Sequence, residues 1–219
     1  MVLLGQIYQE MGDIKNANHW FIMGIETNQD SYGALFGAAY TEYFLGSFPI
    51  AEHHIIEAIQ LDPNNWDGRH IYGSILLSQS RWIESRIQFQ KAIELNPTFG
   101  WSYYGLGTSL IELGLLDEAR NVVLKTPELL TDRNAVADLL AAYANALQTQ
   151  TNNTSEAIYF YEYALQYAPE DLGILKSLMT LYSLQNECSK VEEIYGRLVE
   201  AEKRLGINQS EVKPTCRGN

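Results

Sequence analysis

Long hydrophobic runs and a basic leader are missing from this 219-residue sequence. No stretch approaches the roughly 18–20 consecutive apolar residues that a membrane-spanning helix needs. The opening residues, MVLLGQIYQEMGD, contain no Lys or Arg, so they lack the basic n-region of a secretory leader. We therefore expect neither a transmembrane helix nor a signal peptide.

Cysteine is scarce as well. Cys188 and Cys216 are the two cysteines of the chain. Two are too few for a disulfide framework or for a four-ligand structural zinc site. The simplest interpretation is a reducing compartment, which predicts a cytoplasmic protein. The alternative is a periplasmic or lumenal fragment of a longer chain.

Basic residues are few compared with acidic ones. The chain has 15 Lys and Arg against 27 Asp and Glu, a formal net charge of −12. Residues 1–68 contain one basic residue, Lys15, and nine acidic residues. Affinity for nucleic acid comes mainly from cations that neutralise phosphates, and anionic membranes attract cations in the same way. We therefore expect no nucleic-acid partner and no direct membrane insertion.

Motifs of covalent chemistry are missing too. The sequence contains no P-loop, no G-x-S-x-G, no C-x-x-C and no H-E-x-x-H. His53, His54 and Glu57 could in principle form a metal pair across one helical turn, but a polar outer helix face is the simpler interpretation. The prediction is that the chain is not an enzyme and has no catalytic residues, no cofactor and no metal.

The sequence does contain a repeat. The octets "AIQLDPNN" and "AIELNPTF" place Pro63 and Pro97 at equivalent positions, one period of about 34 residues apart. Pro169, in "YALQYAPED", follows Pro97 after two such periods and a small excess. We expect insertions to absorb this excess at two places, the larger near 124–134 and the smaller near 148–155. Six copies of the repeat then remain in phase.

Each copy has the pattern of two helices. Apolar residues recur at intervals of three and four on one face, a Gly or polar turn follows, and the face then repeats. Proline ends the second helix. Such a pair is unable to bury both faces alone, so pairs stack. The predicted fold is all-α, a right-handed α-solenoid of stacked antiparallel helix pairs with a C-terminal capping helix. The predicted domain covers 1–205, with repeats at 1–30, 31–65, 66–99, 100–134, 135–171 and 172–205.

The pattern resembles the tetratricopeptide repeat family, whose signature is W-x2-L-G-x2-Y, then A-x3-F, then P, over about 34 residues. "YGLGTSLIELGLLDEA" at 104–119 is similar to the first helix and turn, and "AEHHIIEAIQLDP" at 51–63 to the second helix. The resemblance covers residues 1 to about 202. The sequence departs from the family pattern at Glu42 and Arg69, where large apolar residues are typical, and at Pro127, inside a second helix.

The two ends carry their own expectations. Met1 falls about three residues inside the expected first helix, and "MVLLGQI" is apolar where a terminal repeat is usually polar. We expect the chain to be trimmed from a longer protein; a short, frayed first helix is the alternative. Near the other end, increasing polarity predicts a capping helix that Gly206 stops. Residues 206–219 are predicted to be a disordered tail.

The resemblance implies that the first helix of each pair lines an inner groove, the usual site for a partner's peptide or helix. Helical spacing places ten candidate residues there: Phe36, Tyr40, Tyr43, Phe44, His70, Ser74, Trp101, Tyr104, Thr108 and Asn145. Exposed aromatic clusters are typical of partner sites. Burial of these rings against second helices or a missing neighbouring unit is the alternative.

The predicted function is a protein–protein interaction scaffold that binds a peptide or helix with apolar or aromatic anchors and neutral to basic flanks. The family's chaperone-binding members hold a C-terminal carboxylate with a Lys/Asn/Arg clamp. The corresponding positions here are Phe36, Tyr40, Ile71, Trp101 and Gly105. Chaperone tails are therefore disfavoured as partners. The alternative function is a non-catalytic arm of a larger enzyme or of a membrane-anchored assembly factor, presenting substrate to a domain absent from this chain.

Overall fold

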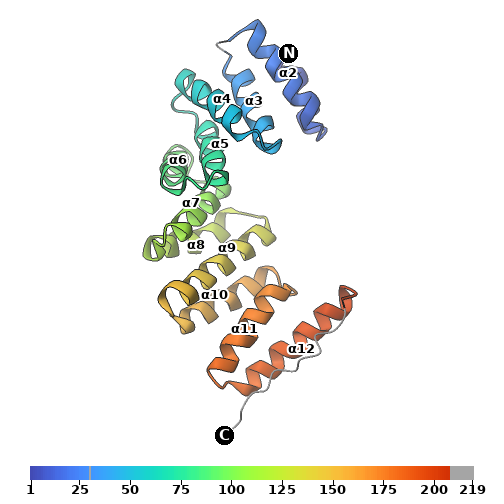
Figure 1. The fold of residues 1–219 in the computed structure, drawn as a ribbon, viewed down its shortest axis with the longest axis vertical. Coiled ribbons are helices and arrows are strands. Elements are labelled where there is room, and N and C mark those ends of the chain that lie inside the picture. Colours follow the sequence, from blue (N-terminus) through green and yellow to red (C-terminus); the bar gives the residue numbers. More distant parts are fainter. Residues whose placement is uncertain (30, 208–219) are drawn as a thin grey trace. The chain divides into compact units, whose positions relative to one another are not determined.

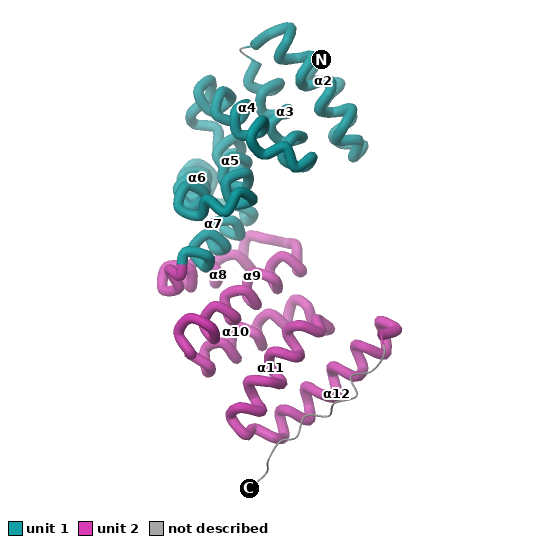
Figure 2. The backbone as a smooth tube through the Cα atoms, viewed as in Figure 1, with its two compact units in different colours: residues 1–113 teal, residues 114–219 magenta. Residues whose placement is uncertain are grey.

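A computed structural model describes residues 1–29 and 31–207 (Figure 1). The described ranges contain α-helices and one short π-helical turn, with no strand among them. The chain divides into two compact units, Met1–Leu113 and Gly114–Asn219 (Figure 2). The all-α, helical-repeat prediction is confirmed. The predicted disordered tail falls almost wholly on residues 208–219, which lie outside the described residues.

The first unit consists of antiparallel helix pairs. Its helices alternate between a first helix of 13 residues, apart from the shorter α1, and a second helix of 14 residues. They are α1 (Val2–Glu10), α2 (Ile14–Thr27), α3 (Tyr32–Phe44), α4 (Phe48–Leu61), α5 (Trp66–Ser78), α6 (Trp82–Leu95) and α7 (Gly100–Glu112).

The second unit also consists of helices, whose lengths are less regular. Its helices are α8 (Leu116–Leu129), α9 (Arg133–Ala146), the π-helical turn η1 (Leu147–Thr151), α10 (Thr154–Tyr167), α11 (Leu172–Leu184) and α12 (Cys188–Arg204). At 17 residues α12 is the longest of the described helices. It ends where the sequence predicts, with Gly206 at φ +68°, a left-handed conformation that suits glycine.

The small and aliphatic residues of the repeat form the core together. In the first unit Leu35, Ala39, Ala51, Ile55 and Ala58 are buried together where α3 meets α4. Alanine and glycine at these positions let two helix backbones approach closely, and the larger aliphatic side chains fill the space between them. The tight turn inside a pair needs a left-handed residue, which is Gly46 after α3 and Ser80 after α5.

Of the two predicted insertions, only the one near 148–155 is present. Helices α3, α5 and α7 begin at equal intervals, and α9 begins at Arg133, slightly earlier than the same interval would place it. No residues are therefore added near 124–134. Helix α11 begins later than the period predicts, and the whole excess lies at η1 and its flanks, before α10. The predicted boundary between residues 134 and 135 falls inside α9. The division into six repeats otherwise stays a prediction.

Pro127 explains that error. It lies within α8, which continues two residues further to Leu129. A proline lacks the N–H that would bond the carbonyl four residues earlier, so it suggests a helix end in the sequence. Pro127 stands two residues before the end of α8, so the bond that it removes lies in the last turn. The segment interpreted as an extended link is therefore mostly the last turn of a normal second helix.

The two other departures from the family pattern form side-chain hydrogen bonds. Glu42 is buried, and its Oε2 lies 2.8 Å from Nδ1 of His54 on α4. Arg69 donates from Nη1 to Oε1 of Gln88 at 3.1 Å. The outer-face interpretation holds for the exposed His53, which lies 3.4 Å from Glu57. It is wrong for His54, because only 14% of that side chain is exposed.

Candidate functional site

Aromatic side chains of α3 lie along one face of the helix. Phe36, Tyr40 and Phe44 are spaced by four residues, which brings them to the same side of an α-helix. The ring centroids of Phe36 and Tyr40 are 6.4 Å apart, and those of Tyr40 and Phe44 are 4.7 Å apart. Tyr43 contacts Phe44 edge-on at 5.1 Å. Phe44 is 57% exposed, so this face is only partly covered.

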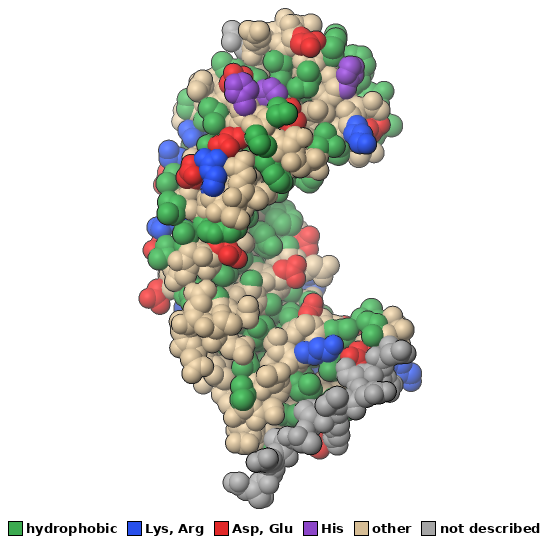
Figure 3. Space-filling model, viewed as in Figure 1, with side chains coloured by type: hydrophobic (Ala, Val, Ile, Leu, Met, Phe, Trp, Pro, Cys, Tyr) green, Lys and Arg blue, Asp and Glu red, His purple; other side chains and the backbone are tan. Residues whose placement is uncertain are grey.

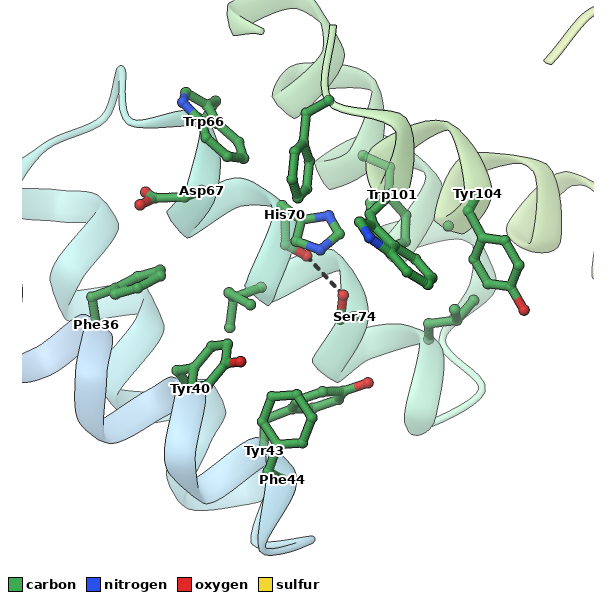
Figure 4. Close-up of a pocket in the computed structure, with 15 residues that line it drawn as sticks. Phe36, Tyr40, Tyr43, Phe44, Trp66, Asp67, His70, Ser74, Trp101 and Tyr104 are labelled. Atoms are coloured by element: carbon green, nitrogen blue, oxygen red, sulfur yellow. Dashed lines mark hydrogen bonds between the residues drawn. The ribbon is translucent and has the colours of Figure 1, made fainter. Parts of the chain in front are cut away.

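These rings form one wall of a cavity of about 580 Å³ in the first unit. Figure 4 shows the α3 aromatics on one side, Trp101 and Tyr104 of α7 on the other, and α5 between them. The volume is in the range of pockets that bind ligands. The lining residues are Phe36, Tyr40, Tyr43, Phe44, Trp66, Asp67, His70, Ile71, Ser74, Leu77, Phe89, Phe99, Trp101, Tyr104 and Gly105.

Phe89 connects the cavity to the core. Its ring comes from α6, is 1% exposed, and lies against Gly73 on α5 and Gly105 on α7. A Cβ placed on Gly105 would lie 2.2 Å from Cζ of Phe89. Glycine at position 105 therefore lets the Phe89 ring lie between two inner helices. The packing of Phe89 in the core therefore also sets the shape of the cavity wall beside Gly105.

His70 is largely buried among rings in the middle of the cavity. Its ring centroid lies 4.9 Å from that of Phe99 and 5.6 Å from that of Phe89. Its Nδ1 lies 3.2 Å from the Ser102 hydroxyl. Burial lowers the pKa of His70 to about 4, because the charged form loses its hydration. At neutral pH the imidazole is therefore uncharged.

Asp67 is the one carboxylate in the lining. Tyr32 on α3 donates its hydroxyl to Oδ1 of Asp67 at 2.6 Å, and the Gly68 N–H donates to the same oxygen at 2.7 Å. Burial, followed by this hydrogen bond, raises the pKa of Tyr32 well above its usual range. The hydroxyl thus remains protonated at neutral pH and holds Asp67 in place.

Eight of the ten residues that the sequence places in the groove line this cavity. They are Phe36, Tyr40, Tyr43, Phe44, His70, Ser74, Trp101 and Tyr104. Thr108 does not line it, and its hydroxyl donates to the Tyr104 carbonyl at 3.0 Å. Asn145 belongs to the second unit. Whether any of them contacts a partner stays a proposal.

Sequence reasoning missed Trp66, Asp67 and Phe99, which line the cavity near the start of α5 and α7. Trp66 is the first residue of α5, and Phe99 is the N-cap of α7. Counting by helical spacing from packed positions inside a helix does not reach an N-cap. The ring centroids of Phe99 and Trp66 are 4.5 Å apart. Two aromatics separated by nearly one repeat are the signal that could have found them.

Asn145 lines a different, polar depression of about 290 Å³ in the second unit. Asp138, Tyr161, Asp171 and Ser177 also contribute to it. Burial raises the pKa of Asp138, and the negative charges of Asp171 and Asp132 add to this effect. This depression has none of the exposed aromatic character of the first unit's cavity.

Three further features bear on possible partners: clusters of metal ligands, membrane-spanning helices and basic patches. Nowhere in residues 1–29 and 31–207 do three or more His, Cys, Asp or Glu side chains gather as a metal would require. None of the helices in those ranges is both long and apolar enough to cross a bilayer. On the face drawn in Figure 3, acidic and basic side chains are scattered without a continuous basic patch.

Known proteins share this repeat and this fold. Residues 88–121, from within α6 to the start of α8, match the family profile described as tetratricopeptide repeat. The sequence has no match among curated proteins. Among solved structures, pilF of Pseudomonas aeruginosa superposes with a TM-score of 0.73 at 19% identity, over 93% of this chain and 89% of that one.

Two further structures are similar. YrrB, described as a TPR protein with an unusual peptide-binding site, has a TM-score of 0.66 at 17% identity, over 84% of this chain and 92% of its own. TTC0263 of Thermus thermophilus, described as a thermophilic TPR protein, has a TM-score of 0.58 at 19% identity, over 82% of this chain and 96% of its own. At these identities the similarity shows the fold.

Repeat proteins of this kind stack their helix pairs into extended surfaces. The family profile over residues 88–121 and the superposed structures confirm the resemblance predicted from the repeat: the chain has the fold of the tetratricopeptide repeat proteins.

Proposed function

We propose that the aromatic cavity of the first unit binds a peptide or short helix of a partner protein. The observation that carries the proposal is the cavity itself, about 580 Å³ lined by rings from α3, α5 and α7. Two of its aromatic residues, Phe44 and Trp101, remain 57% and 39% exposed. Exposed rings clustered in a concave site are typical of residues that carry binding energy.

Two further features support a peptide rather than a small metabolite. The cavity is lined by residues of three successive inner helices, α3, α5 and α7, which suits an extended or helical segment. The similar protein YrrB is itself described as having an unusual peptide-binding site.

The test is a selection of peptides from a random library displayed on phage, using the whole chain as bait. Tyr40→Ala combined with Trp101→Ala should weaken the binding of selected peptides about 10- to 100-fold, because each ring buries a large apolar area on binding. Circular dichroism and urea unfolding would show that the variant still folds.

The matched control is Tyr159→Ala combined with Tyr163→Ala. These tyrosines lie on α10 in the second unit, outside the cavity, and Tyr159 is 53% exposed. The control should bind the selected peptides as the wild type does. Unchanged affinity in the folded Tyr40/Trp101 variant would show that the aromatic cavity is not the site.

A further inference from the structure

The cavity has an unbalanced charge. Its lining contains the carboxylate of Asp67 and no Lys or Arg. His70, the histidine of the lining, is neutral at pH 7 because burial lowers its pKa to about 4. A ligand that enters this cavity therefore meets one negative group among aromatic rings.

The carboxylate is fixed in position. Tyr32 and the Gly68 N–H both donate to Oδ1 of Asp67, at 2.6 and 2.7 Å. Among the described residues no hydrogen bond reaches Oδ2. The Tyr32 ring is stacked on Phe36, with centroids 5.8 Å apart and planes 10° from parallel. Asp67 thus lies beside the α3 aromatics, held through Oδ1.

The rings favour a cation next to that carboxylate. Figure 4 shows Asp67 beside Trp66, at the end of the cavity where Phe36 lies. The faces of Trp and Tyr rings attract cations, and this attraction strengthens where water is excluded. The stem of an Arg or Lys side chain is apolar, so it packs along rings while its head remains at a polar group.

Other ligand chemistries fit less well. An acidic peptide would meet no Lys or Arg in the lining and would be repelled by Asp67. A wholly apolar segment covering Asp67 would remove water from a carboxylate without giving it a counter-charge, which costs free energy.

We propose that the partner segment places an Arg or Lys side chain in this cavity, with its stem along the rings of Phe36 and Trp66 and its charged head on Asp67. This rests on the proposed function, because it specifies the occupant of the same cavity. Arg is favoured over Lys, since a planar guanidinium stacks on aromatic rings and binds a carboxylate with two donors.

The experiment uses the peptides selected by the whole chain. Selected sequences should be enriched in Arg or Lys next to apolar or aromatic residues. In the tightest binder, replacing the basic residue by citrulline, which keeps the shape of Arg without its charge, should weaken binding about 5- to 30-fold. Asp67→Asn should weaken the Arg peptide by a similar factor and leave the citrulline peptide nearly unchanged.

Two results would separate the claims. Peptides that require Tyr40 and Trp101 but show no basic enrichment, or that bind Asp67→Asn as tightly as wild type, would overturn the basic anchor and leave the groove proposal standing. Peptides that bind independently of Tyr40 and Trp101 would overturn both. Glu57→Gln is the matched control for charge, because this carboxylate lies on α4 outside the cavity, and it should bind the Arg peptide like the wild type.

Discussion

Gly105 and Phe89 show how a single missing Cβ shapes the candidate site. Gly105→Ala would place a methyl group 2.2 Å from the buried Phe89 ring. Overpacking of this kind costs about 1–3 kcal/mol, which exceeds the gain of about 1 kcal/mol from replacing glycine in a helix. We expect the free energy of unfolding, measured in urea, to fall by about 1–2 kcal/mol.

Gly196→Ala is the control for helix propensity. It is a helical glycine of α12, and among residues 1–29 and 31–207 no atom beyond its own helix backbone and chain neighbours lies within 4 Å of an added Cβ. This variant should be more stable than wild type by about 0.5–1 kcal/mol. Equal stabilisation by both alanines would contradict the close approach of α7 to Phe89.

His70 predicts a pH dependence of stability. Its contacts across the packed elements are the rings of Phe89 and Phe99 and the Ser102 hydroxyl, so none of these supplies a counter-charge. Burial lowers its folded-state pKa to about 4, against 6.5 in the unfolded chain. Between these values the unfolded state binds more protons, so stability is complete above pH 6.5 and falls as the pH drops towards 4.

The loss of unfolding free energy attributable to His70 should reach about 2 kcal/mol by pH 5. The measurement is urea unfolding of the wild type and of His70→Gln at pH 7.5 and pH 5. Because glutamine does not titrate, the stability difference between the two proteins should change by that amount. A difference that is the same at both pH values would refute the assignment.

At the scale of the element, helix starts are set by local capping. Asp132 precedes α9 and accepts from the Asn134 and Ala135 N–H groups at 3.0 and 3.1 Å. Asp132→Ala should cost about 1 kcal/mol of unfolding free energy, because two backbone donors lose their acceptor. Thermal or urea unfolding measures this. Asp132→Asn keeps a side-chain oxygen that can accept these bonds, so its loss of unfolding free energy should be clearly smaller. Equal losses in the two variants would mean that the cap does not stabilise this helix start.

At the scale of the whole molecule, the net charge of −12 predicts that the association rate of a basic peptide depends on salt. A negative protein attracts a cationic ligand over about a Debye length, and salt screens this attraction. The association rate of an Arg-containing selected peptide should fall roughly three- to tenfold between low salt and physiological salt. Stopped-flow fluorescence of the tryptophans would follow it. A citrulline peptide serves as the comparison, and an equal salt effect on both would argue against steering by charge.

Much of the architecture was predictable, and the reason is the period. Ala58 and Ala92 recur at equivalent positions of α4 and α6, and both are fully buried. Repeated small and apolar residues at helical spacing leave one solution, a helix pair stacked on the next. Eight of the candidate residues line the cavity because they lie at regular positions of α3, α5 and α7, and their role as a partner site stays a prediction.

The errors occurred where local and tertiary signals conflict. Pro127 suggested a longer link, whereas α8 continues through it to Leu129, two residues further. His54 suggested polar surface, yet it is largely buried against Glu42. A pairing across two helices is not visible in either helix alone.

The sequence by itself determined the repeat, the helix pairs and the acidic balance, since periodicity and composition are properties of the chain. Only the tertiary structure decided that Trp66, Asp67 and Phe99 join the aromatic residues of α3 and α7 in one cavity. Phe99 is an N-cap, which helical spacing does not reach, whereas Trp66 and Asp67 lie one turn before His70 on the same helix. It is packing between successive pairs that brings a carboxylate among the rings.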